Sequence, residues 1–271
     1  MYEQRVAIED LPFFLGLLDH LAEKGSPVPR TIHDRSGAPF RMIGDKAVAL
    51  IEFLPGVSVD SPDAAQAQAV GAALAGLHQN AADFAPRREN AMSLPAWRLL
   101  YEDCGEARLA GIDQSLPSLF ASELDFLAKN WPAHLPRSVI HADLFPDNVL
   151  LLDDRVSGLI DFYFACTDIT AYDVAVTHAA WCFNSDGSRF DPALSAALLA
   201  GYESVRPLSE QERAALPVLA RGASMRFLMT RAYDWMNTPA DAMVTRKDPM
   251  AFARRLEFYS DMGNAGIFDA R

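Results

Sequence analysis

The chain has 271 residues, of which 50% are hydrophobic, and its formal net charge is −12 at pH 7. This length and apolar content allow a buried core in one large domain or two modest ones. The negative charge argues against non-specific nucleic-acid binding and against docking on anionic membranes, and the apolar runs are too short to span a bilayer.

The first part of the chain predicts a helix, a strand and a second helix. Residues 10–24 combine a proline in the first turn, apolar residues at helical spacing and a glycine stop, which predicts a helix. Residues 47–54 are an apolar run ended by Pro-Gly, which predicts a buried strand. The Ser-Pro-Asp sequence at 61–63 indicates a helix start with the serine as N-cap, and this helix should reach about His78.

The hairpin expected next follows from two strand-like runs, 149–152 and 156–160, around an Asp-Asp-Arg turn. If the turn centres between residues 154 and 155, Asn148 and Asp161 are equally far from it. Antiparallel pairing would then place these two residues roughly opposite one another, with about 5 Å between their Cβ atoms. A carboxylate and an amide oxygen at that separation can share a hard cation.

The pattern around this hairpin indicates a reaction. Residues 141–148 read HADLFPDN, which has the form HxDxxxxN, and Asp161 follows the hairpin. Phosphoryl transfer from ATP needs a carboxylate that orients the acceptor hydroxyl, and an Asn and a second carboxylate that hold Mg²⁺. We therefore predict Asp143 as the catalytic base and Asn148 and Asp161 as metal ligands. His141 is expected to brace the loop rather than to transfer a proton. The alternative is three unrelated polar residues around a hairpin.

The remainder of the chain is predicted to be mostly helical. Residues 116–129 are amphipathic, an Asp-Pro pair starts a helix at 191, and a capping box starts a long one at 209. A last helix is expected at 251–262. We divide the chain into a residual small lobe, residues 1–54, and a mainly helical large lobe, residues 55–271.

The strings HADLFPDN and GLIDFYFAC, the latter at 158–166, resemble the aminoglycoside phosphotransferase and choline kinase superfamily, as does Tyr-Asp-Val-Ala at 172–175. Within it, FYFAC is most similar to the bacterial homoserine kinases. The resemblance covers nearly the whole chain and implies an α+β, protein-kinase-like two-lobe fold with a mainly helical C-terminal lobe. The family's first strands, which carry the nucleotide-covering loop, would precede Met1. We therefore expect a truncated N-terminal β lobe and weakened ATP binding or phosphate transfer.

The resemblance also implies roles for residues outside the motif. The residues after the strand at 47–54 would form the hinge that binds adenine, which makes Glu52, Phe53 and Leu54 candidates; an ordinary strand end is the alternative. Asp173 falls where the superfamily has a carboxylate that fixes the catalytic loop. It can also act as N-cap of the helix that follows.

The acceptor that the resemblance implies is L-homoserine, a zwitterion with a hydroxyl group. Its carboxylate calls for an arginine. Arg226 and Arg231 lie on the predicted long helix, although their spacing spreads them around it, and surface arginines are the alternative. Tyr163 can wall the acceptor pocket or pack in the core.

The motif predicts a kinase that uses ATP and Mg²⁺, and the resemblance implies that it is a homoserine kinase of threonine biosynthesis. Near alternatives are a kinase of choline, an aminoglycoside or another amino alcohol. A kinase-like lobe that binds but does not turn over is the non-catalytic alternative. Three cysteines without CxxC spacing are typical of free thiols in a reducing compartment, so we expect a cytoplasmic protein.

Overall fold

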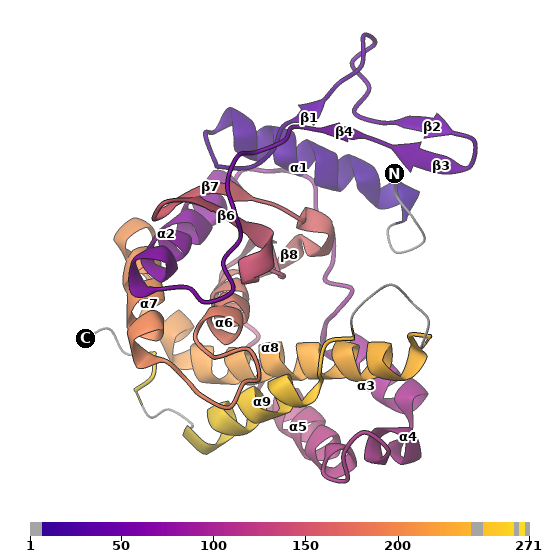
Figure 1. Ribbon diagram of the computed structural model, residues 1–271, viewed down its shortest axis with the longest axis vertical. Coiled ribbons are helices and arrows are strands. Elements are labelled where there is room, and N and C mark those ends of the chain that lie inside the picture. Colours follow the sequence, from indigo (N-terminus) through magenta and orange to yellow (C-terminus); the bar gives the residue numbers. More distant parts are fainter. Residues whose placement is uncertain (1–6, 240–245, 263–265, 269–271) are drawn as a thin grey trace.

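The computed structural model describes residues 7–239, 246–262 and 266–268, and it has a small lobe above a larger helical lobe (Figure 1). The small lobe contains α1 (Leu11–Glu23) and short strands beside it, which are β1 (Thr31–Ile32), β2 (Arg41–Ile43), β3 (Lys46–Val48) and β4 (Leu50–Ile51). β1 pairs antiparallel with β4, and β2 pairs antiparallel with β3. The helix predicted at 10–24 is confirmed as α1.

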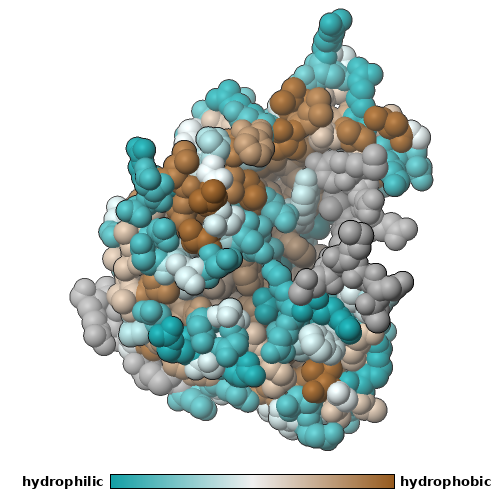
Figure 2. Space-filling view, viewed as in Figure 1, coloured by the Kyte–Doolittle hydropathy of each residue, from teal (hydrophilic) through white to brown (hydrophobic). Residues whose placement is uncertain are grey.

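The single buried strand predicted at 47–54 is wrong. The structure breaks the run into β3 and β4, and Ala47 is its one buried residue. Each of these strands has one partner within the described chain, so much of the run faces solvent and Phe53 is 92% exposed. Figure 2 shows the resulting apolar surface on the upper part of the molecule, to which exposed large side chains contribute, namely Ile32, Met42, Ile43, Leu50 and Phe53.

Helix α1 packs against both lobes. Leu11 and Leu15 pack with Ala47 in a small cluster, whereas Phe14 and Leu17 belong to the main hydrophobic core. One face of α1 thus packs on the strands of the small lobe, and the neighbouring face packs on the core of the large lobe. The lobe boundary at residue 54 stays a prediction.

The large lobe is built around α6, each of whose residues is buried. The helices predicted at 116–129, 191, 209 and 251–262 are confirmed. None of the described helices is long and apolar enough to cross a membrane. The helices of this lobe are α2 (Ala64–Asn80), α3 (Leu94–Cys104), α4 (Glu106–Ala110), α5 (Leu116–Asn130), α6 (Thr170–Trp181), α7 (Pro192–Val205), α8 (Glu210–Asn237) and α9 (Met250–Met262).

Two helix starts show how capping decides a boundary. The predicted N-cap Ser61 is wrong, because α2 begins two residues later with Asp63 as N-cap. The Asp63 carboxylate accepts the backbone N–H of Gln66, and the Gln66 side chain accepts the N–H of Asp63, so two otherwise unpaired donors are satisfied. α8 begins as predicted, with Ser209 and Glu212 in a reciprocal capping box.

Helices α2 and α7 are in direct backbone contact through glycines. A Cβ on Gly201 would lie 2.0 Å from the carbonyl oxygen of Gln68. We expect Gly201→Ala to lower the free energy of unfolding by about 1–3 kcal/mol, because the helices must separate. The thermal midpoint should fall by roughly 2–4 °C for each kcal/mol. Gly76→Ala is the control, because a Cβ there meets nothing within 4 Å and better helix propensity should raise the midpoint. An unchanged midpoint for Gly201→Ala would contradict this packing.

The central strands confirm the hairpin and correct its register. β5 (Arg137–Ile140) pairs with β8 (Cys166–Ile169), and β6 (Val149–Leu152) pairs with β7 (Arg155–Leu159). The turn lies between residues 153 and 154, one earlier than predicted, and a bulge interrupts the pairing after Leu150. Asn148 therefore faces Ile160, whose N–H donates to the Asn148 carbonyl at 3.0 Å, and Asp161 lies one residue beyond.

Candidate active site

The motif loop connects β5 to β6 and carries Asp143 at its centre. Asn148 ends a short 3₁₀ turn, Pro146–Asn148, and its Nδ2 donates to the backbone carbonyl of Asp143 at 2.8 Å and to Oδ2 of Asp143 at 3.3 Å. The sequence folds this way because Pro146 ends the loop in a turn conformation. The two predicted site residues are thus in contact.

The backbone immediately before Asp143 is in an unusual conformation. Ala142 has φ 63°, in the left-handed region, which costs an L-residue other than glycine about 1–2 kcal/mol. Its N–H donates to Oδ1 of Asp173 at 2.7 Å, and the N–H of His141 donates to Oδ2 of Asp173 at 2.7 Å. Asp173 therefore holds the backbone of this loop through two adjacent N–H groups. Its alternative role as an N-cap is wrong, because α6 begins at Thr170.

His141 is placed to brace the loop. Its Nδ1 accepts the N–H of Asp143 at 3.2 Å, and its Nε2 bonds the carbonyl of Ile160 at 2.9 Å. Because a carbonyl accepts, Nε2 carries the proton and the ring is neutral. Burial, the largest influence, lowers the pKa of His141 below its ordinary value. Both ring nitrogens are engaged, which agrees with bracing rather than proton transfer.

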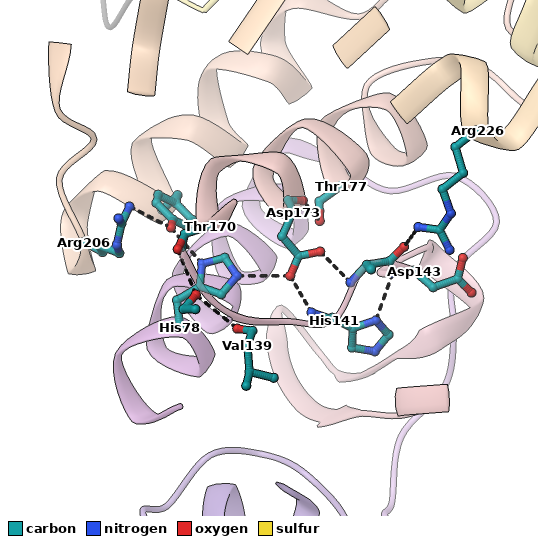
Figure 3. Close-up of polar contacts among 12 residues, drawn as sticks. His78, Val139, His141, Asp143, Thr170, Asp173, Thr177, Arg206 and Arg226 are labelled. Carbon is teal, nitrogen blue, oxygen red and sulfur yellow. Dashed lines mark hydrogen bonds and ion pairs between the residues drawn. The ribbon is translucent and has the colours of Figure 1, made fainter. Parts of the chain in front are cut away.

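A buried hydrogen-bonded chain extends behind Asp173 (Figure 3). Nε2 of His78 donates to Asp173 at 3.0 Å, Nδ1 of His78 accepts from the Tyr202 hydroxyl at 2.8 Å, and Arg206 donates to the Tyr202 oxygen at 3.1 Å. Burial acts to raise the pKa of Asp173, but the hydrogen bonds from His78 and from the backbone N–H of His141 outweigh it and hold that pKa below its ordinary value. The carboxylate that supports the loop is thus kept charged.

The electrostatics of Asp143 differ from those of Asp173. Burial raises the pKa of the Asp143 carboxyl to about 7, against the opposing charge of Arg226 and with support from the nearby charge of Asp161. Perturbed carboxyl groups of this kind are concentrated at functional sites. The charge of Asp161 acts on Asp143, which agrees with a loop that lies close to the end of the hairpin.

Asn148 and Asp161 suit a hard cation. The Asn148 amide nitrogen is turned toward Asp143, which directs its oxygen to the other side, and Asp161 is an exposed carboxylate with φ 63° at the end of β7. Among the described residues, no group of three or more His, Cys, Asp or Glu side chains could hold a metal ion. Mg²⁺ does not need such a group, since it commonly binds one or two protein oxygens together with phosphates and water.

A cavity of about 410 Å³ lies between the small lobe and the hairpin. Glu52, Phe53 and Leu54 line it together with Asp161, so the predicted adenine residues and a predicted metal ligand share one cavity. The size is typical of a small-ligand site. Tyr163 also lines this cavity and packs edge-to-face on Phe14 at 5.7 Å between centroids, so its predicted role at the acceptor stays a prediction.

The two candidate acceptor arginines have different surroundings. Arg226 is 2% exposed and its Nη1 donates to the carbonyl of Ala142 (Figure 3). Arg231 is partly exposed, with its guanidinium 4.5 Å from the centroid of the Phe252 ring. Burial lowers the pKa of Arg231 to about 10, and the charges of Asp248, Asp147 and Asp143 oppose this. Both arginines therefore lie within electrostatic reach of Asp143.

Several contributors to the site were missed by the sequence analysis. His78 supports Asp173 directly from 95 residues away in the sequence, and Tyr202, which is 124 residues from His78, supports His78 in turn. Phe14 and Leu150 form walls of the cavity. A histidine near the end of a helix gives no indication of such a partner. Phe14 is one of the apolar residues at helical spacing in the predicted helix 10–24, and that spacing does not show what the side chain contacts.

Comparison with known proteins identifies the family. A model of the phosphotransferase enzyme family matches residues 2–208. The homoserine kinase of Brucella canis is 50% identical over 271 residues, which covers 99% of this chain and 82% of that protein. The fold matches a microcompartment-associated aminopropanol kinase, with TM-score 0.73, 19% identity and coverage of 99% and 86% of the two chains. It also matches the amicoumacin kinase hAmiN in complex with AMP-PNP, Ca²⁺ and Ami, with TM-score 0.68, 15% identity and coverage of 94% and 78%. The two-lobe kinase-like fold and the family resemblance are confirmed, and the chain belongs to the phosphotransferase enzyme family, among the relatives of the homoserine kinases.

Proposed function

We propose that this protein transfers the γ-phosphate of ATP to the hydroxyl of L-homoserine. The observation that carries the proposal is the 50% identity to a homoserine kinase along 99% of the chain. The contacts among Asp143, Asn148 and the hairpin agree with it, because they match the requirements of phosphoryl transfer. A place in threonine biosynthesis and a cytoplasmic location belong to the same proposal.

Each group in the site has a role in this reaction. Asp143 accepts a hydrogen bond from the acceptor hydroxyl and takes its proton as the hydroxyl oxygen bonds to the γ-phosphorus of ATP, while the bond from that phosphorus to the bridging oxygen breaks and ADP leaves. Asn148 and Asp161 would hold Mg²⁺, which would neutralise charge on the phosphates. The cavity beside Glu52, Phe53 and Leu54 receives the adenine, and backbone groups there can bond its edge. An AMP-PNP complex of a structurally similar kinase supports ATP as the donor.

Arg231 is the better candidate for the acceptor carboxylate. It is partly exposed, it donates to the carbonyl of Asp248 at 3.3 Å, and it forms no ion pair with a carboxylate in the described part of the chain. Arg226 is buried and already engaged with Ala142. A partly desolvated guanidinium binds a carboxylate strongly, because two of its N–H groups can donate to the two carboxylate oxygens at the same time.

The direct test is ADP release by the chain with Mg-ATP and a set of acceptors. We expect turnover above the no-acceptor control with L-homoserine, and much less with choline or 1-amino-2-propanol, which lack a carboxylate. Turnover with an amino alcohol but not with L-homoserine would overturn the proposed acceptor. The absence of turnover with every acceptor would favour the non-catalytic alternative.

Arg231→Met should raise the KM for L-homoserine by about 10–100-fold, because a charge-assisted hydrogen-bonded pair is lost. The KM for ATP should change little, since the arginine lies away from the cavity beside Leu54. Arg254→Met is the matched control: Arg254 is a partly exposed arginine on the neighbouring α9 that also lies near Asp248. An unchanged KM for L-homoserine in Arg231→Met would remove Arg231 as the anchor.

A further inference from the structure

Both backbone polar groups of Ala142 are held by buried charged side chains. Its N–H donates to Oδ1 of Asp173, and its carbonyl oxygen accepts from Nη1 of Arg226. The two side chains approach from different helices, Asp173 from α6 and Arg226 from α8 (Figure 3). Between them, Ala142 stays in the left-handed region, where its Cβ crowds the backbone.

The surroundings of Arg226 fix its guanidinium. The Cζ atom lies 5.1 Å from the centroid of the Phe164 ring and 4.6 Å from that of Phe227. Within the described residues, no carboxylate lies within 4.0 Å of Arg226, so an ion pair does not direct it. Because the side chain is 2% exposed, a substrate carboxylate has little access to it. Among the described residues, the carbonyl of Ala142 is the group to which the guanidinium donates a hydrogen bond, through Nη1.

We propose that Arg226 is a positioning residue, which together with Asp173 imposes the left-handed conformation of Ala142 and thereby aims the Asp143 carboxylate at the acceptor hydroxyl. Asp143 follows Ala142 directly, so rotation about the Ala142 backbone displaces its carboxylate. Asp173 binds the N–H of Ala142, and Arg226 binds its carbonyl group, which belongs to the peptide bond between Ala142 and Asp143. Without Arg226, this carbonyl group would lose its hydrogen bond. The proposal rests on the proposed function for its kinetic test.

The kinetic test compares Arg226→Met with Arg221→Met. Arg221 lies on the same helix, but its guanidinium binds Glu123 at 2.6 and 3.0 Å, away from the loop. We expect Arg226→Met to lower kcat by about 10–100-fold, as a misplaced reacting group does, with both KM values within about threefold. Arg221→Met should leave kcat unchanged. An increased KM for L-homoserine with unchanged kcat would overturn the proposal in favour of acceptor binding.

Rescue by a second substitution separates positioning from a general structural role. Glycine adopts the left-handed conformation without the Cβ clash, so Ala142→Gly in the Arg226→Met background should recover kcat by about fivefold. A merely destabilised protein would not regain turnover in this way, and failure of rescue would contradict the proposal. Arg226→Lys, which keeps one donor, replaces the methionine variant if that variant does not fold, with the same rescue expected.

Hydrogen exchange gives a measurement that needs no substrate. The amide of Ala142 is protected by its bond to Asp173, and release of the carbonyl should loosen the loop. We expect faster exchange in a peptide covering residues 138–145 in Arg226→Met than in Arg221→Met, and equal exchange would overturn the proposal. If the wild-type protein does not phosphorylate L-homoserine, the proposed function fails, whereas this comparison still decides the role of Arg226.

Discussion

Asp143→Asn is expected to lower kcat by about 10³-fold or more while the affinity for Mg-ATP changes little. The substitution keeps the size of the side chain and an oxygen that can accept the 3.3 Å hydrogen bond from Asn148, so the loop should keep its shape. It removes the carboxylate that would receive the hydroxyl proton. Steady-state ADP release gives kcat, and titration calorimetry gives the nucleotide affinity.

The control for this variant is Asp147→Asn in the same loop. Asp147 is exposed and pairs with Lys247 at 3.2 Å on the surface, and we assign it no part in catalysis. Surface ion pairs contribute about 0–1 kcal/mol, so both stability and turnover should be close to wild type. A fully folded Asp143→Asn protein that retained most of its turnover would exclude Asp143 as the base.

Asp161→Asn is expected to weaken Mg-ATP binding by roughly 100-fold, because a ligand of the metal loses its charge. Asparagine is the right replacement, since the residue has φ 63° and asparagine tolerates this region better than alanine does. The variant therefore tests the carboxylate and not the backbone. Calorimetry with and without Mg²⁺ measures the effect.

Binding of the nucleotide without Mg²⁺ should be nearly the same in Asp161→Asn and in the wild type. Asp154→Asn, in the turn at the opposite end of the hairpin, serves as a control for a charge change on this element. If Asp161→Asn bound Mg-ATP with wild-type affinity, Asp161 would not be a metal ligand.

The hairpin illustrates what the sequence could predict. Two apolar runs on either side of a polar turn were enough to predict β6 and β7. The motif predicted that Asp143 and Asn148 belong to one site, and in the structure these two residues are in contact. The predicted register of the hairpin differed from the observed one by one residue. In the turn, Asp153 adopts a left-handed conformation, and a bulge after Leu150 adds one residue to the hairpin. Neither feature has a sequence pattern strong enough to choose between the predicted and the observed register.

Long-range partners were the other part that the sequence could not predict. The carbonyl of Ala142 and its donor Arg226 are 84 residues apart, and the order in which helices pack decides whether they meet. The helical pattern placed Arg226 on a long helix, but one residue's spacing along that helix cannot show which neighbour it faces. The prediction of one buried strand at residues 47–54 was wrong for a related reason. The burial of this segment depends on the strands that pair with it, and the segment's own sequence does not specify them.

The support of Ala142 by Arg226 bears on where this enzyme can be divided. The family match ends at residue 208, and every residue of the HxDxxxxN motif lies well inside it. Arg226 lies beyond that limit on α8, so a fragment cut at the end of the match would inherit the complete motif without one of the groups that hold it in shape. For grafting, truncation or recombination with a relative, the unit to be kept intact is therefore the motif together with α8.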